Sequence, residues 1–129
     1  MRKLLFAFAT LLSLQTLVLA DPLPSYSFWQ NQRGSTLEIF WVNPAGPFDG
    51  VFINQAAGFE CQGIPYPAVG TAAPAAVIFT VSFTKCRSQT VWRGQVSGTT
   101  MSTKWVLTYV KPNGGIGILR GTDVFTRLR

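Results

Sequence analysis

Short polar side chains recur among large aromatic residues in this chain, at positions that a β-strand would turn to one face. In residues 27–41, every second position reads Trp29, Asn31, Arg33, Ser35, Leu37, Ile39 and Trp41. Because side chains of a strand alternate between its two faces, this pattern predicts that Asn31 and Ser35 point toward a core. A buried polar group without a partner costs about 1–3 kcal/mol. We therefore expect partners for both, and the chemistry they offer is hydrogen bonding.

The same mixture recurs on one face of each later run of alternating residues. These faces carry Phe52, Asn54 and Ala56; Phe79, Val81 and Phe83; Ser88, Thr90, Trp92, Gly94 and Val96; Thr103, Trp105, Leu107 and Tyr109; and Asp123 with Phe125. One or two polar groups in a core are ordinary, since backbone groups or buried water can satisfy them. The larger number of polar side chains on these faces indicates a cup filled by water or by a small molecule, with aromatic walls and a few orienting polar groups.

The residues argue against catalysis and against a metal centre. The chain has no histidine, and its five carboxylates are those of Asp21, Glu38, Asp49, Glu60 and Asp123, which form no evident acid–base pair or nucleophile constellation. Two cysteines without histidine do not make a closed zinc site. We expect a protein that is not an enzyme and that uses no metal or cofactor.

The elements that would position these side chains are strands. After residue 20 helix signals are nearly absent, and runs at 27–41, 50–56, 77–84, 88–97, 101–110 and 118–128 alternate with turn-rich segments such as "NPAGPFDG" and "KPNGGIG". Repeated short strands with turns between them predict an antiparallel sandwich or barrel. We count seven strands in this pattern, and an eighth in the Tyr66–Gly70 region would close an up-and-down barrel without exposed edges. Such a barrel is just wide enough to hold one small molecule.

The first twenty residues are typical of a cleaved secretory signal. Arg2 and Lys3 precede an apolar stretch, and the segment ends in Val18-Leu19-Ala20. The alternative, a membrane anchor, is disfavoured because polar residues interrupt the run, whereas a spanning helix needs about 20 mostly apolar residues. We predict a signal peptide at 1–20 and one compact domain at 21–129, in a secreted or periplasmic protein.

The charge and the cysteines fit a protein outside the cytoplasm. Without Arg2 and Lys3, nine of the eleven basic residues remain against five acidic ones, and the formal charge falls from +6 to +4. The bases are scattered, which favours a solvated basic surface over nucleic-acid or membrane binding. An even cysteine count in an oxidising compartment favours one disulfide, Cys61–Cys86, over two free thiols. The loop closed by it would contribute roughly 3–4 kcal/mol of stability in the chain-entropy model.

Five collinear segments resemble the biotin-binding avidins and streptavidin in order and spacing. They are "WQNQRGST" at 29–36, "GVFINQAAG" at 50–58, "TVWRGQ" at 90–95, "TKWVL" at 103–107 and "GTDVFTRL" at 121–128. The segments "AAGFECQGIPYPAVG" and "KCRSQTVW" are similar to those of the short bacterial avidins that form dimers and carry a disulfide. The resemblance covers essentially the whole of the predicted mature chain.

The resemblance implies an eight-stranded up-and-down barrel that holds biotin by its ureido ring at the bottom of the cup. It implies that Asn31 and Ser35 donate to the ureido oxygen, and that Asn54 and Asp123 accept the ureido N–H groups. It further implies that Thr90 faces the sulfur and that Ser88 faces the valeryl tail. The walls around the ring system would be Phe83, Trp92, Trp105 and Leu107, and the closing loop would contain Ala57 and Gly58.

Some residues differ from the family pattern. Phe52 stands where the family usually has tyrosine, Phe83 where a tryptophan is common, and Arg33 where leucine or a small residue is usual. The segment "VKPNGGIGILR" lacks the tryptophan that tetrameric members lend across an interface, so we expect a homodimer. The leading prediction is a secreted, high-affinity biotin-binding protein. The alternative is an avidin-like barrel whose altered pocket binds another small ligand, or biotin only weakly.

Overall fold

Eight antiparallel strands make up most of the chain that the computed structural model describes, which is residues 21–74 and 76–129. The strands are β1 (Ser27–Asn31), β2 (Thr36–Val42), β3 (Pro47–Ile53), β4 (Pro65–Ala73), β5 (Ala76–Phe83), β6 (Ser88–Ser97), β7 (Thr100–Val110) and β8 (Ile116–Arg127). A single 3₁₀ turn, η1 (Thr84–Cys86), joins β5 to β6 in the described part of the chain. The signal peptide predicted at 1–20 lies outside the described residues.

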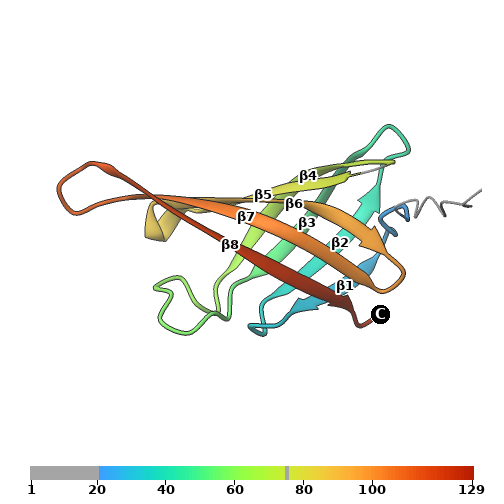
Figure 1. Ribbon diagram of the computed structural model, residues 1–129, viewed down its shortest axis with the longest axis horizontal. Coiled ribbons are helices and arrows are strands. Elements are labelled where there is room, and N and C mark those ends of the chain that lie inside the picture. The colour runs from blue at the N-terminus through green and yellow to red at the C-terminus, as the bar shows by residue number, and fades with distance from the viewer. Residues whose placement is uncertain (1–20, 75) are drawn as a thin grey trace, which may run out of the picture.

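The strands follow one another around a closed barrel in chain order, and β8 pairs with β1 to complete it (Figure 1). The predicted eight-stranded up-and-down barrel is therefore confirmed, and the expected strand near Tyr66–Gly70 is the longer β4. Closure pairs strands that would otherwise present free edges. The hairpin of β7 and β8 projects beyond the other strands, at the left of Figure 1.

Residues 27–41 form two strands rather than one continuous strand. The chain turns back after Asn31 through a tight loop in which Gly34 adopts a φ of +85°, a conformation that favours glycine. In the register of β1 and β2, Trp29 pairs with Leu37 and Ser27 with Ile39. Odd-numbered residues therefore stay on the inner face on both sides of the turn. The predicted parity holds across the turn, although residues 27–41 form two strands.

Trp41 does not face the core, contrary to its predicted parity. The pairing of β2 with β3 shifts by one residue between Ile39 and Val42. Such a β-bulge re-aims the side chains beyond it. Trp41 is 54% exposed as a result, whereas Ile39 is fully buried.

One end of the barrel is filled and the other is open. Trp29, Ile39, Met101 and Phe125 are fully buried, and the Trp29 indole N–H donates to Ser27 Oγ at 2.8 Å. Along β7 the inner residues change from buried at Met101 and Thr103 to half-buried from Trp105 onward. The barrel therefore has an apolar base and a cup above it.

A disulfide ties two segments at the open end. Cys61, in the loop after β3, is bonded to Cys86 at the end of η1, with a Cα–Cα separation of 6.0 Å. This confirms the predicted pairing. The bridge holds the β3–β4 loop against the start of β6, at the mouth of the cup.

Candidate ligand-binding site

A cavity of about 150 Å³ lies inside the open half of the barrel. Its lining combines the polar residues predicted to face inward with aromatic and aliphatic side chains. The lining residues are Asn31, Arg33, Ser35, Phe52, Asn54, Ala56, Phe59, Thr90, Trp92, Trp105, Leu107, Leu119 and Asp123. Residues from β1, β3, β6, β7 and β8 and from two loops thus meet at one place.

The side chain of Asn31 supports the β1–β2 turn with one end and leaves the other free to donate. Its Oδ1 accepts the backbone N–H groups of Arg33 at 3.0 Å and Ser35 at 2.9 Å. These two donors identify that atom as the oxygen of the amide. The NH₂ group is therefore what Asn31 can offer to a molecule in the cavity.

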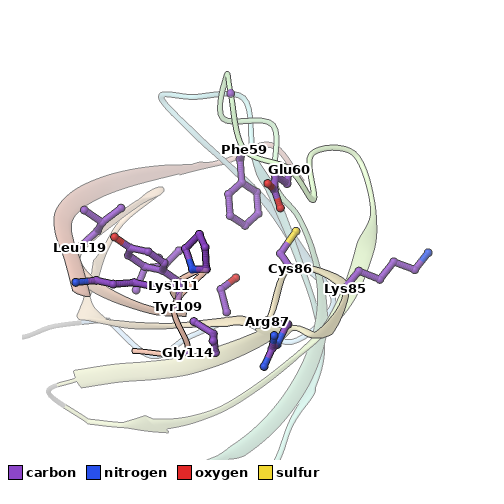
Figure 2. Close-up of a pocket in the computed structure, with 14 residues that line it drawn as sticks. Phe59, Glu60, Lys85, Cys86, Arg87, Tyr109, Lys111, Gly114 and Leu119 are labelled. Atoms are coloured by element: carbon purple, nitrogen blue, oxygen red, sulfur yellow. The ribbon is translucent and has the colours of Figure 1, made fainter. Parts of the chain in front are cut away.

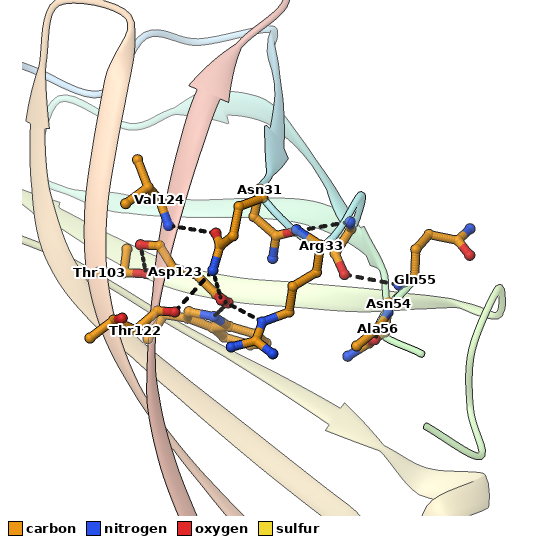
Figure 3. A network of polar contacts seen from close by, with 12 residues as sticks. Asn31, Arg33, Asn54, Gln55, Ala56, Thr103, Thr122, Asp123 and Val124 are labelled. Carbon is orange, nitrogen blue, oxygen red and sulfur yellow. Dashed lines mark hydrogen bonds and ion pairs between the residues drawn. The ribbon is translucent and has the colours of Figure 1, made fainter. Parts of the chain in front are cut away.

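Ser35, like Asn31, can donate a hydrogen bond to a molecule in the cavity. Its Oγ accepts the backbone N–H of Gln55 at 2.9 Å, so its hydroxyl proton remains available as a donor. Asn54 Oδ1 likewise accepts a backbone N–H, that of Ala56 at 2.8 Å, and it keeps one lone pair for a further donor. Figure 3 shows Asn31 at the β1–β2 turn and Asn54 in the loop after β3.

Asp123, on β8, is the acceptor of the site. Its side chain is only 5% exposed. Oδ2 accepts the indole N–H of Trp92 at 2.9 Å, and Oδ1 accepts Gln32 Nε2 at 3.1 Å and Arg33 Nε at 3.2 Å (Figure 3). Charged acceptors with several donors make strong, well-oriented bonds. The carboxylate is thereby held in place, and it retains one lone pair for a ligand.

Gln32 also substitutes for a missing strand partner beside Asp123. Where β1 has turned away, its Oε1 accepts the Val124 N–H at 2.9 Å, and its Nε2 donates to the Thr122 carbonyl at 3.1 Å. From the neighbouring β7, Thr103 Oγ1 donates to the Asp123 carbonyl at 2.9 Å. Both flanks of the β8 backbone are therefore fixed at the acceptor.

Aromatic rings form the floor and one wall of the cavity. The Trp92 ring stacks on Phe79, with centroids 4.8 Å apart, and Phe52 lies 4.7 Å from Trp92. Trp105 lies against Gly121, where a Cβ atom would fall 2.3 Å from its Cζ2. The glycine thus lets the indole lie flat on β8 beside the cavity.

A wider cavity of about 560 Å³ forms the mouth above this one, and Phe59, Leu107 and Leu119 line both. Figure 2 shows Phe59 and Glu60 on the loop side, with Tyr109, Lys111 and Leu119 on the hairpin opposite. Ser88 lines the mouth, and its Oγ is buried without a hydrogen-bond partner in the described part of the chain. A buried unpaired hydroxyl is a natural contact for a ligand atom.

Most of the predicted site residues come together, and two do not. Ten line the inner cavity: Asn31, Arg33, Ser35, Phe52, Asn54, Thr90, Trp92, Trp105, Leu107 and Asp123; Ser88 and Gly58 line the mouth. Phe83, expected in the wall, is fully buried behind it, at 6.1 Å from the Phe52 centroid and 5.3 Å from that of Tyr66. Ala57 lies exposed in the β3–β4 loop and lines neither cavity.

Besides Ala56, which the alternation had placed on the inner face, three residues that line or support the inner cavity were not predicted. Leu119 lies four positions before Asp123 on β8, so continuing the alternation backward would have identified it. Phe59 and Gln32 lie in loops, where alternation carries no information. For these two, the sequence holds no signal of comparable strength.

The sequence that builds this barrel and its cavity matches a known family of proteins. A model of the avidin family matches residues 21–128. This match covers most of the chain, so the protein belongs to the avidin family. The chain is 37% identical over 108 residues to afifavidin from Afifella pfennigii, an alignment that covers 78% of this chain and 67% of afifavidin.

Solved avidin structures share the fold. The structure is similar to the bradavidin2–biotin complex, with a TM-score of 0.79, 47% identity and coverage of 83% of this chain and 100% of that one. It is also similar to the rhizavidin–biotin complex, with a TM-score of 0.76, 33% identity and coverage of 82% and 93%. Family membership makes this chain a binding protein rather than an enzyme, and avidins bind biotin as a ligand without needing a cofactor.

No group of three or more His, Cys, Asp or Glu side chains gathers as a metal site within the described residues. In the same part of the chain, no helix is long and apolar enough to cross a membrane.

Proposed function

We propose that this protein is a secreted, high-affinity biotin-binding protein that holds the ureido ring at the bottom of its cup. The observation that carries the proposal is the polarity of the inner cavity. Asn31 and Ser35 each have a donor to spare, and Asp123 is an acceptor with a lone pair to spare. A ureido group needs this set, because its carbonyl oxygen accepts while its two N–H groups donate.

The remaining lining residues suit the rest of the ligand. In the proposed complex, Asn31 and Ser35 donate to the ureido oxygen, and Asp123 and Asn54 accept the two N–H groups. The negative charge of Asp123 polarises the ring and strengthens the bonds to its oxygen. Phe52, Trp92, Trp105 and Leu107 enclose the bicyclic rings, Thr90 faces the sulfur, Ser88 meets the tail in the mouth, and Ala57 and Gly58 belong to the loop that closes over it.

Titration calorimetry of the oxidised protein spanning residues 21–129 tests this function. Biotin should bind stoichiometrically, and lipoate, which has a similar acid tail but no ureido group, should bind at least about a thousandfold more weakly. A thousandfold difference corresponds to about 4 kcal/mol. Equal affinities would contradict the ureido assignment, and absence of biotin binding would contradict the function.

One observation favours a second candidate function, the binding of a different small ligand. Arg33, a cation, lines the cavity and donates to Asp123, so the acceptor already has a charged partner. A head group other than a ureido ring that fits this pair would then be preferred. Thermal-shift measurements with small cyclic ureas, lactams and imides separate the two candidates, because the first requires biotin to stabilise the barrel most.

Secretion and dimer formation complete the proposal. The charged, apolar and small-residue pattern of residues 1–20 and the Cys61–Cys86 bridge both suit an oxidising compartment. Exposed apolar side chains on the β7–β8 hairpin and β8, at Ile116, Ile118 and Val124, suit burial against a second copy. N-terminal sequencing of exported protein should begin at Asp21, and light scattering should give the mass of two chains.

A further inference from the structure

The first seven residues of β8, from Ile116 to Thr122, have no neighbouring strand on one side. β7 pairs with all of them on the other side, whereas β1 pairs with β8 only from Phe125 to Arg127 in the described part of the chain. From this free edge we infer that the protein takes biotin as part of a peptide, which pairs with β8 as an extended strand while its biotinylated lysine side chain fills the cup. This inference deepens the proposed function and rests on it.

Even-numbered residues of β8 direct their backbone groups toward the free edge. On that side, the Gln32 side chain bonds to the Val124 N–H and to the Thr122 carbonyl. On the other side, Lys111 at the end of β7 donates its N–H to the Gly115 carbonyl at 2.7 Å, so odd-numbered residues bond to β7. Backbone groups alternate between the two sides of an antiparallel strand. The free groups are therefore the N–H and carbonyl of Ile116, Ile118 and Arg120, and the N–H of Thr122.

These free groups lie in a stretch that is open to solvent. Ile116, Ile118 and Leu119 are each more than half exposed, and the β7–β8 hairpin projects beyond the other strands (Figure 1). An exposed edge can pair with an additional strand, in which main-chain hydrogen bonds supply affinity and alternate side chains supply specificity. Gln32 closes one end of the edge, beside Thr122. An added strand would therefore begin there and run toward the tip of the hairpin.

Leu119, in the middle of the free edge, connects the edge to the cavities. It lines both the inner cavity and the mouth, through which the tail of a bound biotin would leave. Side chains that lie opposite each other on neighbouring strands share a face of the sheet. A residue of the added strand opposite Leu119 therefore directs its side chain toward the mouth. The mouth, of about 560 Å³, has room for a lysine side chain that is joined to biotin by an amide bond.

The charges around the edge favour an acidic peptide. Among the described residues that line the mouth, three are cations and one is an acid, and Figure 2 shows them: Lys85, Arg87 and Lys111, and Glu60. Arg120 is exposed on the edge itself. Opposite charges on neighbouring strands stabilise their pairing, and like charges destabilise it. We therefore expect glutamate in the added strand beside Arg120, and apolar residues on the face that points toward the mouth.

The probe is the peptide acetyl-Glu-Val-Glu-Lys(biotin)-Glu-Val-Glu, labelled with fluorescein at its C-terminus. With the lysine opposite Leu119 in an antiparallel pairing, the third and fifth residues lie opposite Arg120 and Ile118 and bond to them. Methylation of the N–H groups of these two residues removes bonds to β8. Methylation of the second and sixth residues, whose N–H groups point away from β8, is the matched control. Acetyl-Lys(biotin) with the same label lacks the flanking residues.

Dissociation is followed by the loss of fluorescence anisotropy in excess biotin, on the oxidised wild type spanning residues 21–129 and on two variants. Ile118→Pro removes an N–H that faces the edge and makes no bond to β7, and proline is tolerated on edge strands in this position. Ile118→Ala shortens the side chain and keeps the N–H. Thermal melts establish that both variants are folded, and the methylated peptides test the same bonds on the wild type.

On the wild type, the peptide should dissociate at least about tenfold more slowly than acetyl-Lys(biotin), because several main-chain hydrogen bonds outweigh the ordering of the peptide. Methylation of the third and fifth residues, or Ile118→Pro, should abolish this difference. Methylation of the second and sixth residues, or Ile118→Ala, should preserve it. Acetyl-Lys(biotin) should dissociate from Ile118→Pro as it does from the wild type.

Equal rates for the two methylated peptides, or for the peptide and acetyl-Lys(biotin), would overturn the inference while leaving biotin binding intact. Light scattering in which Ile118→Pro converts a dimer to single chains would also overturn it, since the edge would then pair with a second copy. If the wild type does not bind biotin itself, the proposed function fails and the inference fails with it.

Discussion

The indole of Trp105 lies directly on the backbone of Gly121, its cross-strand partner in the β7–β8 ladder. No side chain larger than hydrogen fits there, since a Cβ atom would approach Cζ2 to 2.3 Å. Trp105 also lies under the Arg33 guanidinium and lines the inner cavity. One glycine on β8 therefore sets the position of an aromatic wall and of the cation above it.

Gly121→Ala should weaken biotin binding by at least about tenfold. Overpacking of this kind costs about 1–3 kcal/mol, and moving Trp105 into the cavity is a way to relieve it. Stopped-flow measurement of biotin dissociation, with tryptophan fluorescence as the signal, checks the result. Gly115→Ala, in the β7–β8 loop, is the control: its Cβ would meet the side chains of Asn113, at 3.1 Å, and Lys111, at 3.9 Å, but no atom of Trp105, and dissociation should be unchanged. Equal rates in both variants would contradict the role given to Gly121.

Asp123→Ala should reduce biotin affinity by roughly tenfold to a hundredfold or more. The lost bond is charge-assisted, and such bonds contribute about 1.5–3 kcal/mol. The variant also leaves the Trp92 indole N–H and the Arg33 guanidinium without their acceptor, so some loss of stability will accompany it. Calorimetry at a temperature well below the variant's melting point separates these effects. A folded variant with undiminished affinity would exclude Asp123 as a ligand acceptor.

Alternation within each strand predicted the inner face of this barrel, because successive side chains of a strand point to opposite faces. Asn31, Ser35 and Asp123 were found in this way. The β1–β2 turn preserved the parity since Trp29 pairs with Leu37, an odd residue with an odd residue. The β-bulge between Ile39 and Val42 interrupted this alternation and turned Trp41 outward. A bulge inserts one residue into one strand, and nothing in the local residue types marked it.

Alternation along a strand does not predict the contacts made by loop residues, or which inward-facing residues lie behind the lining of the cavity. Gln32 and Phe59 lie in loops, and their places depend on how the chain closes around β8 and on the disulfide. Phe83 has the right parity but stands behind Phe52, because an inner face has more residues than a small cavity can expose. The partner of Arg33 was likewise unpredictable, since it comes from a strand 90 residues away in sequence.

Reduction of the Cys61–Cys86 bridge should lower the melting temperature by more than about 10 °C. The bridge closes a separation of 25 residues, which contributes roughly 3–4 kcal/mol in the chain-entropy model, and each kcal/mol shifts Tm by about 4–8 °C in a domain of this class. Scanning calorimetry with and without reductant measures it. Biotin dissociation should also accelerate, because Phe59 at the mouth belongs to the loop that the bridge holds. A Cys61→Ala/Cys86→Ala variant that melts like the oxidised protein would contradict this.

Phe52→Tyr should tighten biotin binding by roughly threefold to tenfold. Phe52 is buried in the lining of the inner cavity, 4.7 Å from the Trp92 centroid, and Asn31 and Ser35 supply two donors toward the proposed ureido oxygen. A carbonyl polarised in such a site can accept a third, and one neutral hydrogen bond contributes about 0.5–1.5 kcal/mol net. The gain should appear mainly as slower dissociation, measured by surface plasmon resonance.

Phe79→Tyr is the matched control, since Phe79 stacks on Trp92 and does not line the cavity. Weaker binding in Phe52→Tyr would mean that the hydroxyl is buried without a partner, and that the ligand lies away from Asn31 and Ser35.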